Sequence, residues 1–314
     1  MDMNVGDFKN QYEPKHATPP KAIGVIGIGV MSGELVKNLI KSGYNVNIWS
    51  RNGQKCEFLH TNLGHNMFAG KLKTLLSARA VLKNSDIVFN CVSDHIVSKK
   101  IIRTNFGLNN ASDTILQGKG FIEMTPIEPT ASLEIKEMIE MKGGKYLEAQ
   151  AQTNKLGGIL ILTGGNKSLF DTCNSCFEAI GYDALYYGEV GHATIINLII
   201  QQLKAVCIAA LSEGFAFAHE CGIKEEDFLQ IMESITDTQS KYLMDKANMI
   251  VKKSYTNVQQ SLSNMHKQLT VASDVSREVV QPMFLASSLS EIMKSCQRTG
   301  YGNHDVSAIR QYYH

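Results

Sequence analysis

Residues 22–33, AIGVIGIGVMSG, carry the strongest structural signal in the chain. The run up to residue 27 is short and apolar, which predicts a buried β-strand, and apolar residues then recur at helical spacing over 31–41. Gly27 and Gly29 lie between the two, where glycines permit a tight turn and let the backbone approach a pyrophosphate at the helix N-terminus. The predicted cofactor contacts here are Gly27, Ile28, Gly29, Val30 and Met31.

This turn departs from the G-x-G-x-x-G fingerprint at its third glycine. Ser32 occupies that position, and Gly33 follows one place late. Because serine is small, helix and strand can still approach each other, so dinucleotide binding remains the main hypothesis. The alternative is a tight turn that no longer binds a ligand.

The sequence predicts both strands and helices in its first part and helices alone after residue 187. Short apolar strands alternate with helical segments up to residue 187, which predicts an α/β fold with a doubly wound, mostly parallel Rossmann-type sheet. Strand signals then stop, so an all-α domain is expected. The predicted strands are 22–27, 45–49, 87–92, 120–124, 145–149, 159–163 and 184–187, and the predicted helices are 31–41, 72–82, 129–141, 168–180, 193–220, 225–234, 241–252, 259–280, 282–298 and 305–312. The expected organisation is a flexible tail at 1–20, a nucleotide-binding domain at 21–187 and a helical domain at 188–314.

Composition argues against several classes of protein. Hydrophobic residues make up 44% and charged residues 19% of the 314 residues, as is typical of globular proteins. Lys and Arg number 31 against 30 Asp and Glu, so no global positive field indicates direct nucleic-acid binding. Polar residues interrupt the apolar segment 193–218, so no membrane span is expected. The seven scattered cysteines indicate reduced thiols, and the single C-x-x-C pair at Cys173 and Cys176 is too weak to predict a metal site.

The second predicted strand ends in WSRN at 49–52. An NAD-dependent enzyme usually places an acidic residue there to bind the ribose hydroxyls. Ser50 and Arg51 stand in its place, and an arginine pairs well with a 2′-phosphate through charge-assisted hydrogen bonds. The sequence therefore favours NADP(H) over NAD(H), with a solvated surface arginine as the alternative.

Ordered motifs recur along nearly everything after Pro20: GIGVM at 27–31, VKNL at 36–39, CVSD at 91–94, GGKYLEA at 143–149, GEVG at 188–191 and KQL at 267–269. Together they resemble the β-hydroxyacid dehydrogenase family, which includes 3-hydroxyisobutyrate dehydrogenase and glyoxylate reductase. The resemblance implies a two-domain architecture like that of 6-phosphogluconate dehydrogenase. Further cofactor contacts that it implies are Val92, Ser93, Thr125 and Lys267, where the family's K-D-L motif has become K-Q-L.

The same resemblance places a catalytic lysine near the start of the long helix between the domains. That lysine exchanges a proton with the substrate hydroxyl, a role that needs a titratable group. Its position falls on Asn197, and the family asparagine one turn later is Gln201. Lys204 lies one turn further, too far along the helix to replace the lysine easily. The chain is therefore expected to have no functional catalytic residue.

The family's substrate-binding segments are also altered. A D-x-S-T turn that recognises a carboxylate corresponds to EMTP at 123–126, which keeps the hydroxyl of Thr125 but places a proline next to it. An S-G-G loop corresponds to QTN at 152–154, so Gln152 stands where a hydroxyl is expected and both glycines are lost. Because substrate-binding residues of the family are replaced at two separate elements, the sequence indicates that selection for catalytic turnover has ended.

Two main functional hypotheses follow. The first is a catalytically inactive protein that binds NADP(H) and forms a homo-oligomer, a dimer or tetramer, through its helical domain. Stretches such as NSCF at 174–177, GEVGHA at 188–193 and DVSA at 305–308 bring it closest to the dehydrogenase-like part of a chromatin-associated nuclear factor. This likeness implies a nuclear rather than cytoplasmic location and chromatin-associated partners, and an insect fragment or paralogue without the factor's PWWP reader is expected.

The second hypothesis is an active NADP-dependent reductase of a small aldehyde or 3-hydroxy acid, with an atypical active site. A weaker third is a metabolite sensor whose assembly responds to NADP(H).

Overall fold

The computed structural model describes residues 20, 22–63, 70–108, 110, 112–153, 159–179, 182–235 and 240–313. The predicted tail at 1–20 lies outside them except for Pro20. The chain divides into two compact units, Met1–Ile196 and Asn197–His314. The boundary between the units falls inside one long helix.

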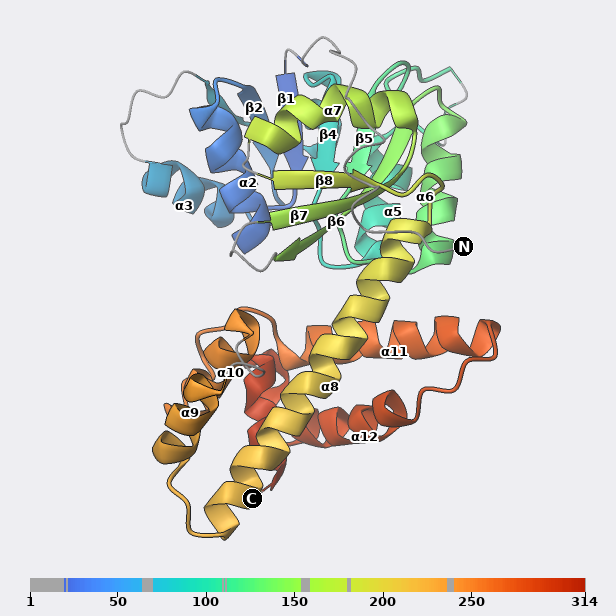
Figure 1. Ribbon diagram of the computed structural model, residues 1–314. Coiled ribbons are helices and arrows are strands. Elements are labelled where there is room, and N and C mark those ends of the chain that lie inside the picture. The colour runs from blue at the N-terminus through green and yellow to red at the C-terminus, as the bar shows by residue number, and fades with distance from the viewer. Residues whose placement is uncertain are drawn as a thin grey trace. The chain divides into compact units, whose positions relative to one another are not determined.

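The first unit is built on an eight-stranded sheet with the order β3-β2-β1-β4-β5-β6-β7-β8 (Figure 1). Neighbouring strands are parallel except for β6 and β7, so the predicted doubly wound α/β fold is confirmed. The strand order reverses at β1, which lies between β2 and β4, and ligands of such sheets bind at this switch point. The strands are β1 (Ala22–Ile26), β2 (Asn45–Trp49), β3 (Leu72–Thr74), β4 (Ile87–Asn90), β5 (Gly120–Glu123), β6 (Lys145–Thr153), β7 (Ile159–Gly165) and β8 (Tyr182–Tyr186).

Helices cover both faces of this sheet (Figure 1). One apolar cluster joins α2, α3 and α7 to one face, and a second joins α4, α5 and α6 to the other. The strands are therefore buried on both sides, which explains their continuous apolar runs. The helices are α2 (Val30–Lys41), α3 (Gly53–Leu63), α4 (Ala78–Lys83), α5 (His95–Asn105), α6 (Pro129–Glu140) and α7 (Lys167–Ala179).

The single helix predicted at 72–82 is wrong. Strand β3 and helix α4 occupy this segment, because Leu72 pairs with Val46 of β2 and the hydroxyl of Ser77 caps α4 by accepting the N–H of Ala80 at 3.1 Å. Strand pairing is a long-range contact that local periodicity does not report.

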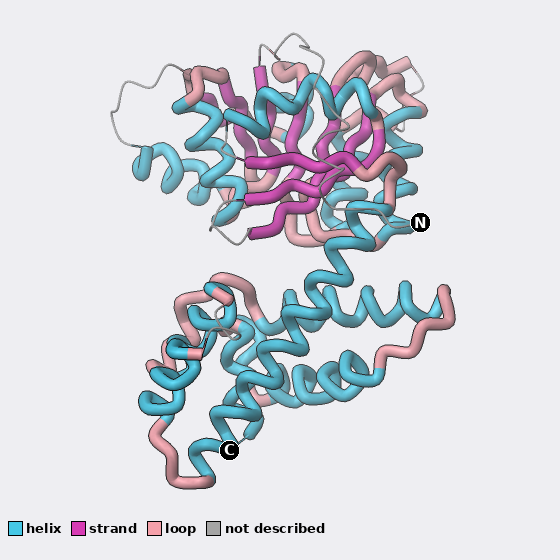
Figure 2. Tube along the Cα trace, in the orientation of Figure 1, coloured by secondary structure: helices cyan, strands magenta, loops and turns pink. Residues whose placement is uncertain are grey.

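The second unit contains only helical elements among its described residues (Figure 2). Ala205 and Ile208 of α8 pack with residues of α11 and α12 in its core. By length and composition α8 is long and apolar enough to cross a bilayer, and 39% of its apolar window is buried within the described structure. The elements are α8 (His192–Glu220), α9 (Glu225–Ser234), α10 (Lys241–Val251), α11 (Leu262–Glu278), α12 (Phe284–Arg298) and two 3₁₀ helices, Tyr301–Asn303 and Val306–Tyr313.

Glu148 of β6 fixes the start of α8. Its carboxylate accepts the N–H groups of Gly191 and Ala193, both at 2.9 Å, and the hydroxyls of Thr194 and Ser132, both at 2.8 Å. Burial raises the pKa of Glu148, and these hydrogen bonds oppose the rise. A carboxylate at the positive end of a helix is a stabilising arrangement, so β6 and α8 are tied together inside the first unit.

Candidate nucleotide-binding site

Gly27 turns the chain at the end of β1. Its φ of +87° lies in the left-handed region that favours glycine, and its N–H donates to the carbonyl of Trp49 at 2.8 Å. A Cβ at this position would lie 2.3 Å from the carbonyl oxygen of Cys91. Only glycine fits, because the chain segments that follow β1, β2 and β4 meet here.

The first turn of α2 is open to solvent, with Val30 89% exposed and Met31 45% exposed. Its N–H groups have no acceptor within the helix, so they carry partial positive charge. The Oγ of Ser32 accepts the N–H of Gly29 at 2.7 Å, so the residue at the third-glycine position closes the turn. At Gly29 a Cβ would be 3.9 Å from the nearest atom, which leaves room for a pyrophosphate.

A cavity of about 470 Å³ lies along the ends of β1, β2 and β4. Arg51, Lys55 and Lys100 bring three cationic side chains to its lining. None of its described lining residues is acidic. The glycine turn and the cationic wall thus fit an anionic dinucleotide, including one with an additional phosphate on its ribose.

The structure brings most of the predicted cofactor residues together. Val30 lines a neighbouring cavity, while Met31 lines neither. Lys267 is exposed on α11 and belongs to the other unit. The residues that line the 470 Å³ cavity as predicted are Gly27, Ile28, Gly29, Ser50, Arg51, Val92 and Ser93.

Glu123 forms a buried polar cluster below the ends of β4 and β5. Its carboxylate accepts the amide of Asn90 at 2.9 Å, the hydroxyl of Ser98 at 2.5 Å and the N–H of Thr125 at 2.9 Å. Burial raises the pKa of Glu123, and these hydrogen bonds oppose the rise. The hydroxyl of Thr125 accepts the N–H of Val92 at 3.1 Å and is hydrogen-bonded to Glu123. It is therefore engaged in holding the end of β4.

The positions where the resemblance places the family's catalytic and substrate-binding residues hold amides. Asn197 and Gln201 lie one turn apart on α8 and are both buried, with Gln201 donating to the Oδ1 of Asn197 at 3.5 Å. Gln260 donates to the Oε1 of Gln201 at 3.2 Å. Gln152, on β6, is also buried. None of these side chains exchanges a proton near neutral pH.

Lys204 lies further along α8. Its ammonium is 5.3 Å from the centre of the Tyr242 ring, and burial lowers its pKa. It is therefore partly buried beside Tyr242 within the helical unit.

Sequence reasoning missed the contribution of α3 and α5 to the cavity. Lys55 comes from α3, and Val97, Lys100 and Ile101 come from α5. A local signal for α5 exists, because the carboxylate of Asp94 caps the helix by accepting the N–H of Val97 at 3.0 Å. That cap, together with the apolar residues Val97 and Ile101 four positions apart, predicts a helix soon after β4.

Residues 22–188 match the family model described as the NAD binding domain of 6-phosphogluconate dehydrogenase. Residues 191–313 match the model described as NAD-binding of NADP-dependent 3-hydroxyisobutyrate dehydrogenase. The chain therefore belongs to the β-hydroxyacid dehydrogenase family, and its first unit is an NAD(P)-binding domain. The resemblance and the cofactor class inferred from the motifs are confirmed.

Among curated proteins, the chain is similar to the cytokine-like nuclear factor N-PAC. The Anopheles gambiae protein is 36% identical over 290 residues, which cover 91% of this chain and 49% of the relative. The Homo sapiens protein is 28% identical over 299 residues, which cover 94% and 52%. The chain spans about half the length of the curated relatives that it matches.

Solved structures share the fold at low sequence identity. The 3-hydroxyisobutyrate dehydrogenase from Salmonella typhimurium has a TM-score of 0.80 at 19% identity, covering 92% of this chain and 99% of that chain. Psf3 in complex with NADP⁺ has a TM-score of 0.78 at 15% identity, with the same coverage. These likenesses extend over both units and concern the fold alone.

Proposed function

We propose that the chain is a dehydrogenase-like protein that binds NADP(H) and does not turn over substrate. One contrast carries the proposal: the glycine turn and cationic cavity are present, while Asn197 stands where the resemblance places the family's catalytic lysine. A bound nicotinamide supplies hydride-transfer chemistry. An asparagine supplies no proton, so the chain keeps a ligand site without the acid–base group that the reaction needs.

The preference for NADP(H) rests on the charge of the cavity. Arg51 follows β2 at the place where an acidic residue binds the ribose of NAD, and Lys55 and Lys100 add positive charge. A 2′-phosphate would be attracted to this set, and an acidic residue that would repel it is absent from the described lining.

Replacing Arg51 with alanine is expected to weaken NADPH binding by roughly 10- to 100-fold, because hydrogen bonds to a charged group contribute about 1.5–3 kcal/mol. NADH lacks the 2′-phosphate, so its affinity is expected to change little. Calorimetric titration of both nucleotides measures this difference. The matched control is Arg103→Ala, which removes an exposed arginine of α5 that does not line the cavity. Equal losses for NADPH and NADH in Arg51→Ala would contradict the proposed specificity.

No turnover is expected to be detectable when glyoxylate or succinic semialdehyde is tested with NADPH. The same result is expected when 3-hydroxyisobutyrate is tested with NADP⁺. Asn197→Lys is expected to restore little, because the hydroxyl of Thr125 is engaged within the Glu123 cluster and Pro126 has no N–H to offer a carboxylate. Absorbance at the NADPH band follows the reaction. A rate above about one per second would favour the alternative, an active NADP-dependent reductase with an atypical site.

The wider role that we propose is an oligomeric scaffold in the nucleus. The similarity to a cytokine-like nuclear factor supports a nuclear location, and chromatin-associated partners are proposed from the resemblance of the motifs alone. Most of the described large apolar side chains that are exposed lie in Asn197–His314, the shorter unit, which supports self-association there as a dimer or tetramer. Light scattering after size exclusion measures the subunit number, and a monomer would remove the scaffold proposal.

A further inference from the structure

Four lysines lie together where parallel strands of the first unit begin, at the opposite ends of the strands from the glycine turn. Lys119 directly precedes β5, and its carbonyl accepts the N–H of Lys145, the first residue of β6, at 2.8 Å. Lys83 ends α4, and its carbonyl accepts the ammonium of Lys119 at 3.4 Å. Lys142 lies in the turn between α6 and β6. These four residues form the basic edge of the sheet.

Uncharged acceptors hold three of the four ammonium groups in place. They are the carbonyls of Ser85 and Asn110 and the hydroxyl of Ser168, which lie 2.5, 2.6 and 2.9 Å from the ammonium groups of Lys119, Lys142 and Lys145. An ammonium has three N–H donors, so each of these lysines can still donate to a ligand. Because the acceptors are neutral, the side chains are ordered without loss of charge, which reduces the entropy cost of binding an anion.

Carboxylates do not cancel the charge of the basic edge. Within the described part of the chain, none of its four lysines forms an ion pair. Asp86 interacts with Lys119. Asp113 interacts with Lys142, but Arg79 pairs with that carboxylate at 2.7 Å. The edge therefore keeps an excess of positive charge, although the chain as a whole is nearly neutral.

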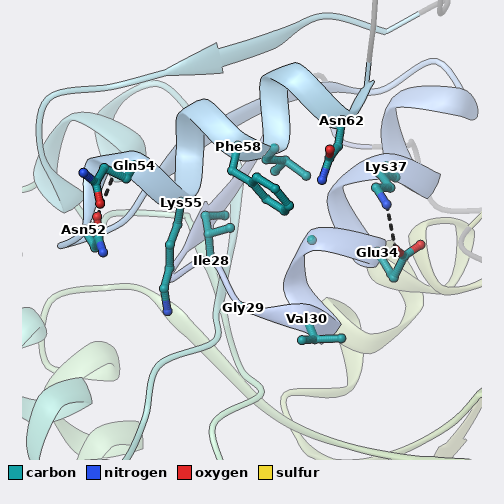
Figure 3. Close-up of a pocket in the computed structure, with 12 residues that line it drawn as sticks. Ile28, Gly29, Val30, Glu34, Lys37, Asn52, Gln54, Lys55, Phe58 and Asn62 are labelled. Carbon is teal, nitrogen blue, oxygen red and sulfur yellow. Dashed lines mark hydrogen bonds and ion pairs between the residues drawn. The ribbon is translucent and has the colours of Figure 1, made fainter. Parts of the chain in front are cut away.

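Lysines on other parts of the same unit differ, because a carboxylate neutralises them. Lys37 pairs with Glu34 at 2.8 Å beside the cavity between α2 and α3 (Figure 3). Lys136 and Lys167, on the flanking helices α6 and α7, have ion-pair partners one turn away. The basic edge is thus distinguished by its charge, and not only by its number of lysines.

Backbone groups around the basic edge are already hydrogen-bonded to one another. The N–H of Gly120 donates to the carbonyl of Asp86 at 3.0 Å, and the N–H of Gly118 donates to the carbonyl of Gly143 at 2.9 Å. A peptide that adds to a sheet needs an unpaired outer strand, and the outer strands here are β3 and β8. The side chains are therefore what the edge offers to a partner, and lysines bind phosphate groups as point charges.

The length of the basic edge fits a partner with closely spaced charges. Neighbouring strands are about 4.8 Å apart, so the distance from β4 to β6 is roughly 10 Å. Duplex DNA carries one negative charge per about 1.7 Å of its axis, so about six phosphates lie along this length. A row of lysines can contact several of them at once.

We infer that the basic edge binds the phosphate backbone of duplex DNA without reading its sequence. Contacts from lysine to phosphate give affinity and position but no base discrimination. The inference goes beyond the proposed function and does not depend on NADP(H) binding, since none of the four lysines lines the nucleotide cavity.

Fluorescence anisotropy of a short labelled duplex tests the inference on the full chain without nucleotide. The expected Kd is roughly 10⁻⁵ M at about 0.1 M salt, within the range of non-specific binding. Four phosphate contacts predict that the logarithm of the binding constant falls with the logarithm of salt concentration with a slope of about −3 to −4. Two duplexes of unrelated sequence are expected to bind equally.

Lys83→Gln combined with Lys145→Gln removes two exposed lysines of the basic edge, so the fold is expected to persist. This double variant is expected to weaken binding at least about tenfold and to make the salt slope shallower by about two. The matched control, Lys224→Gln combined with Lys241→Gln, makes the same change in net charge with exposed lysines of the helical unit. It is expected to change the Kd less than about twofold, because salt screens distant charges.

A second control decides whether the duplex occupies the nucleotide cavity instead. Lys55→Gln combined with Lys100→Gln removes two cations of that cavity and is expected to weaken duplex binding less than about threefold. Polyglutamate at the same concentration of charge is expected to displace less than half of the duplex, because its charges are more widely spaced than those of DNA.

Four results would overturn the inference. They are a duplex that does not bind, equal losses in the basic-edge variant and its matched control, a larger loss in the cavity variant, and displacement by polyglutamate as efficient as by unlabelled duplex. The last result would assign the surface to an acidic protein. If the duplex fails to bind, titration with NADPH still decides the proposed nucleotide binding, so the two failures are distinguishable.

Discussion

Lys246→Met is expected to lower the free energy of unfolding by about 3–5 kcal/mol. Lys246 and Asp305 are fully buried in the helical unit, with their charged groups 2.8 Å apart. Removing the ammonium leaves a buried carboxylate without its cation, which is far costlier than losing an exposed ion pair. Chemical denaturation followed by circular dichroism measures the loss.

The decrease in the free energy of unfolding caused by Lys246→Met depends on pH, and the pKa of Asp305 gives the direction of this dependence. Burial alone would raise the pKa of Asp305, but hydrogen bonds from Lys246 and Ser307 outweigh it and hold the pKa below its usual range. A lowered pKa stabilises the fold above the ordinary aspartate pKa, and this contribution is lost as the pH falls through the folded-state value. The cost of Lys246→Met is therefore expected to be largest near neutral pH and to shrink below about pH 4.

Lys294→Met serves as the control, because it removes a lysine from an exposed ion pair with Glu291 in the same unit. It is expected to change the free energy of unfolding by less than about 1 kcal/mol. If Lys246→Met costs no more than this control, the buried pair does not stabilise the helical unit as argued.

Gly27→Ala is expected to destabilise the protein by at least about 2 kcal/mol and to abolish NADPH binding. The new Cβ would lie 2.3 Å from the carbonyl oxygen of Cys91, and the φ of +87° is unfavourable for any residue with a side chain. Relief requires the segment after β4 to move, which opens the nucleotide cavity. Denaturation and calorimetric titration measure the two effects.

Gly29→Ala tests the effect of a side chain on NADPH binding separately from its effect on the stability of the fold. Its φ of −136° suits any residue, and a Cβ there meets nothing closer than 3.9 Å, so stability is expected to change by less than about 1 kcal/mol. The same Cβ would stand where the pyrophosphate approaches, so NADPH affinity is expected to fall. Equal stability of Gly27→Ala and Gly29→Ala would show that the strand ends are not packed as tightly as the structure has them.

The parallel sheet was predictable because its strands are buried on both faces and appear as short apolar runs. Strand β4, Ile87–Asn90, is such a run and is buried at every position, whereas β2 was predicted with its observed bounds, Asn45–Trp49, although its buried positions alternate with exposed or half-buried ones. Strand β3 is only three residues long at the sheet edge and is defined by its partner β2, so its own sequence does not distinguish it from a helix. Helix α5 carries its main signal in the cap at Asp94 rather than in a long apolar period.

The candidate site was predictable where a motif marks it. The turn from Gly27 to Gly29 indicates a phosphate-binding loop by its residue types alone, and the ends of β2 and β4 supply Ser50, Arg51, Val92 and Ser93 as predicted. Lys55 and Lys100 were not predicted, because they come from α3 and α5 and join Arg51 only through the neighbouring positions of β2, β1 and β4. The pairing of Lys246 with Asp305 has the same origin, since nothing in either local sequence identifies the partner.

Helix α8 continues through the boundary between Ile196 and Asn197. The chain therefore has no extended linker at this point, and a protease has no exposed strand of backbone to cut between the two halves. Each half expressed by itself would carry a severed helix end with its hydrogen-bonding groups unsatisfied. Both halves together are consequently the smallest fragment that we expect to fold when expressed, which limits how far the protein can be truncated.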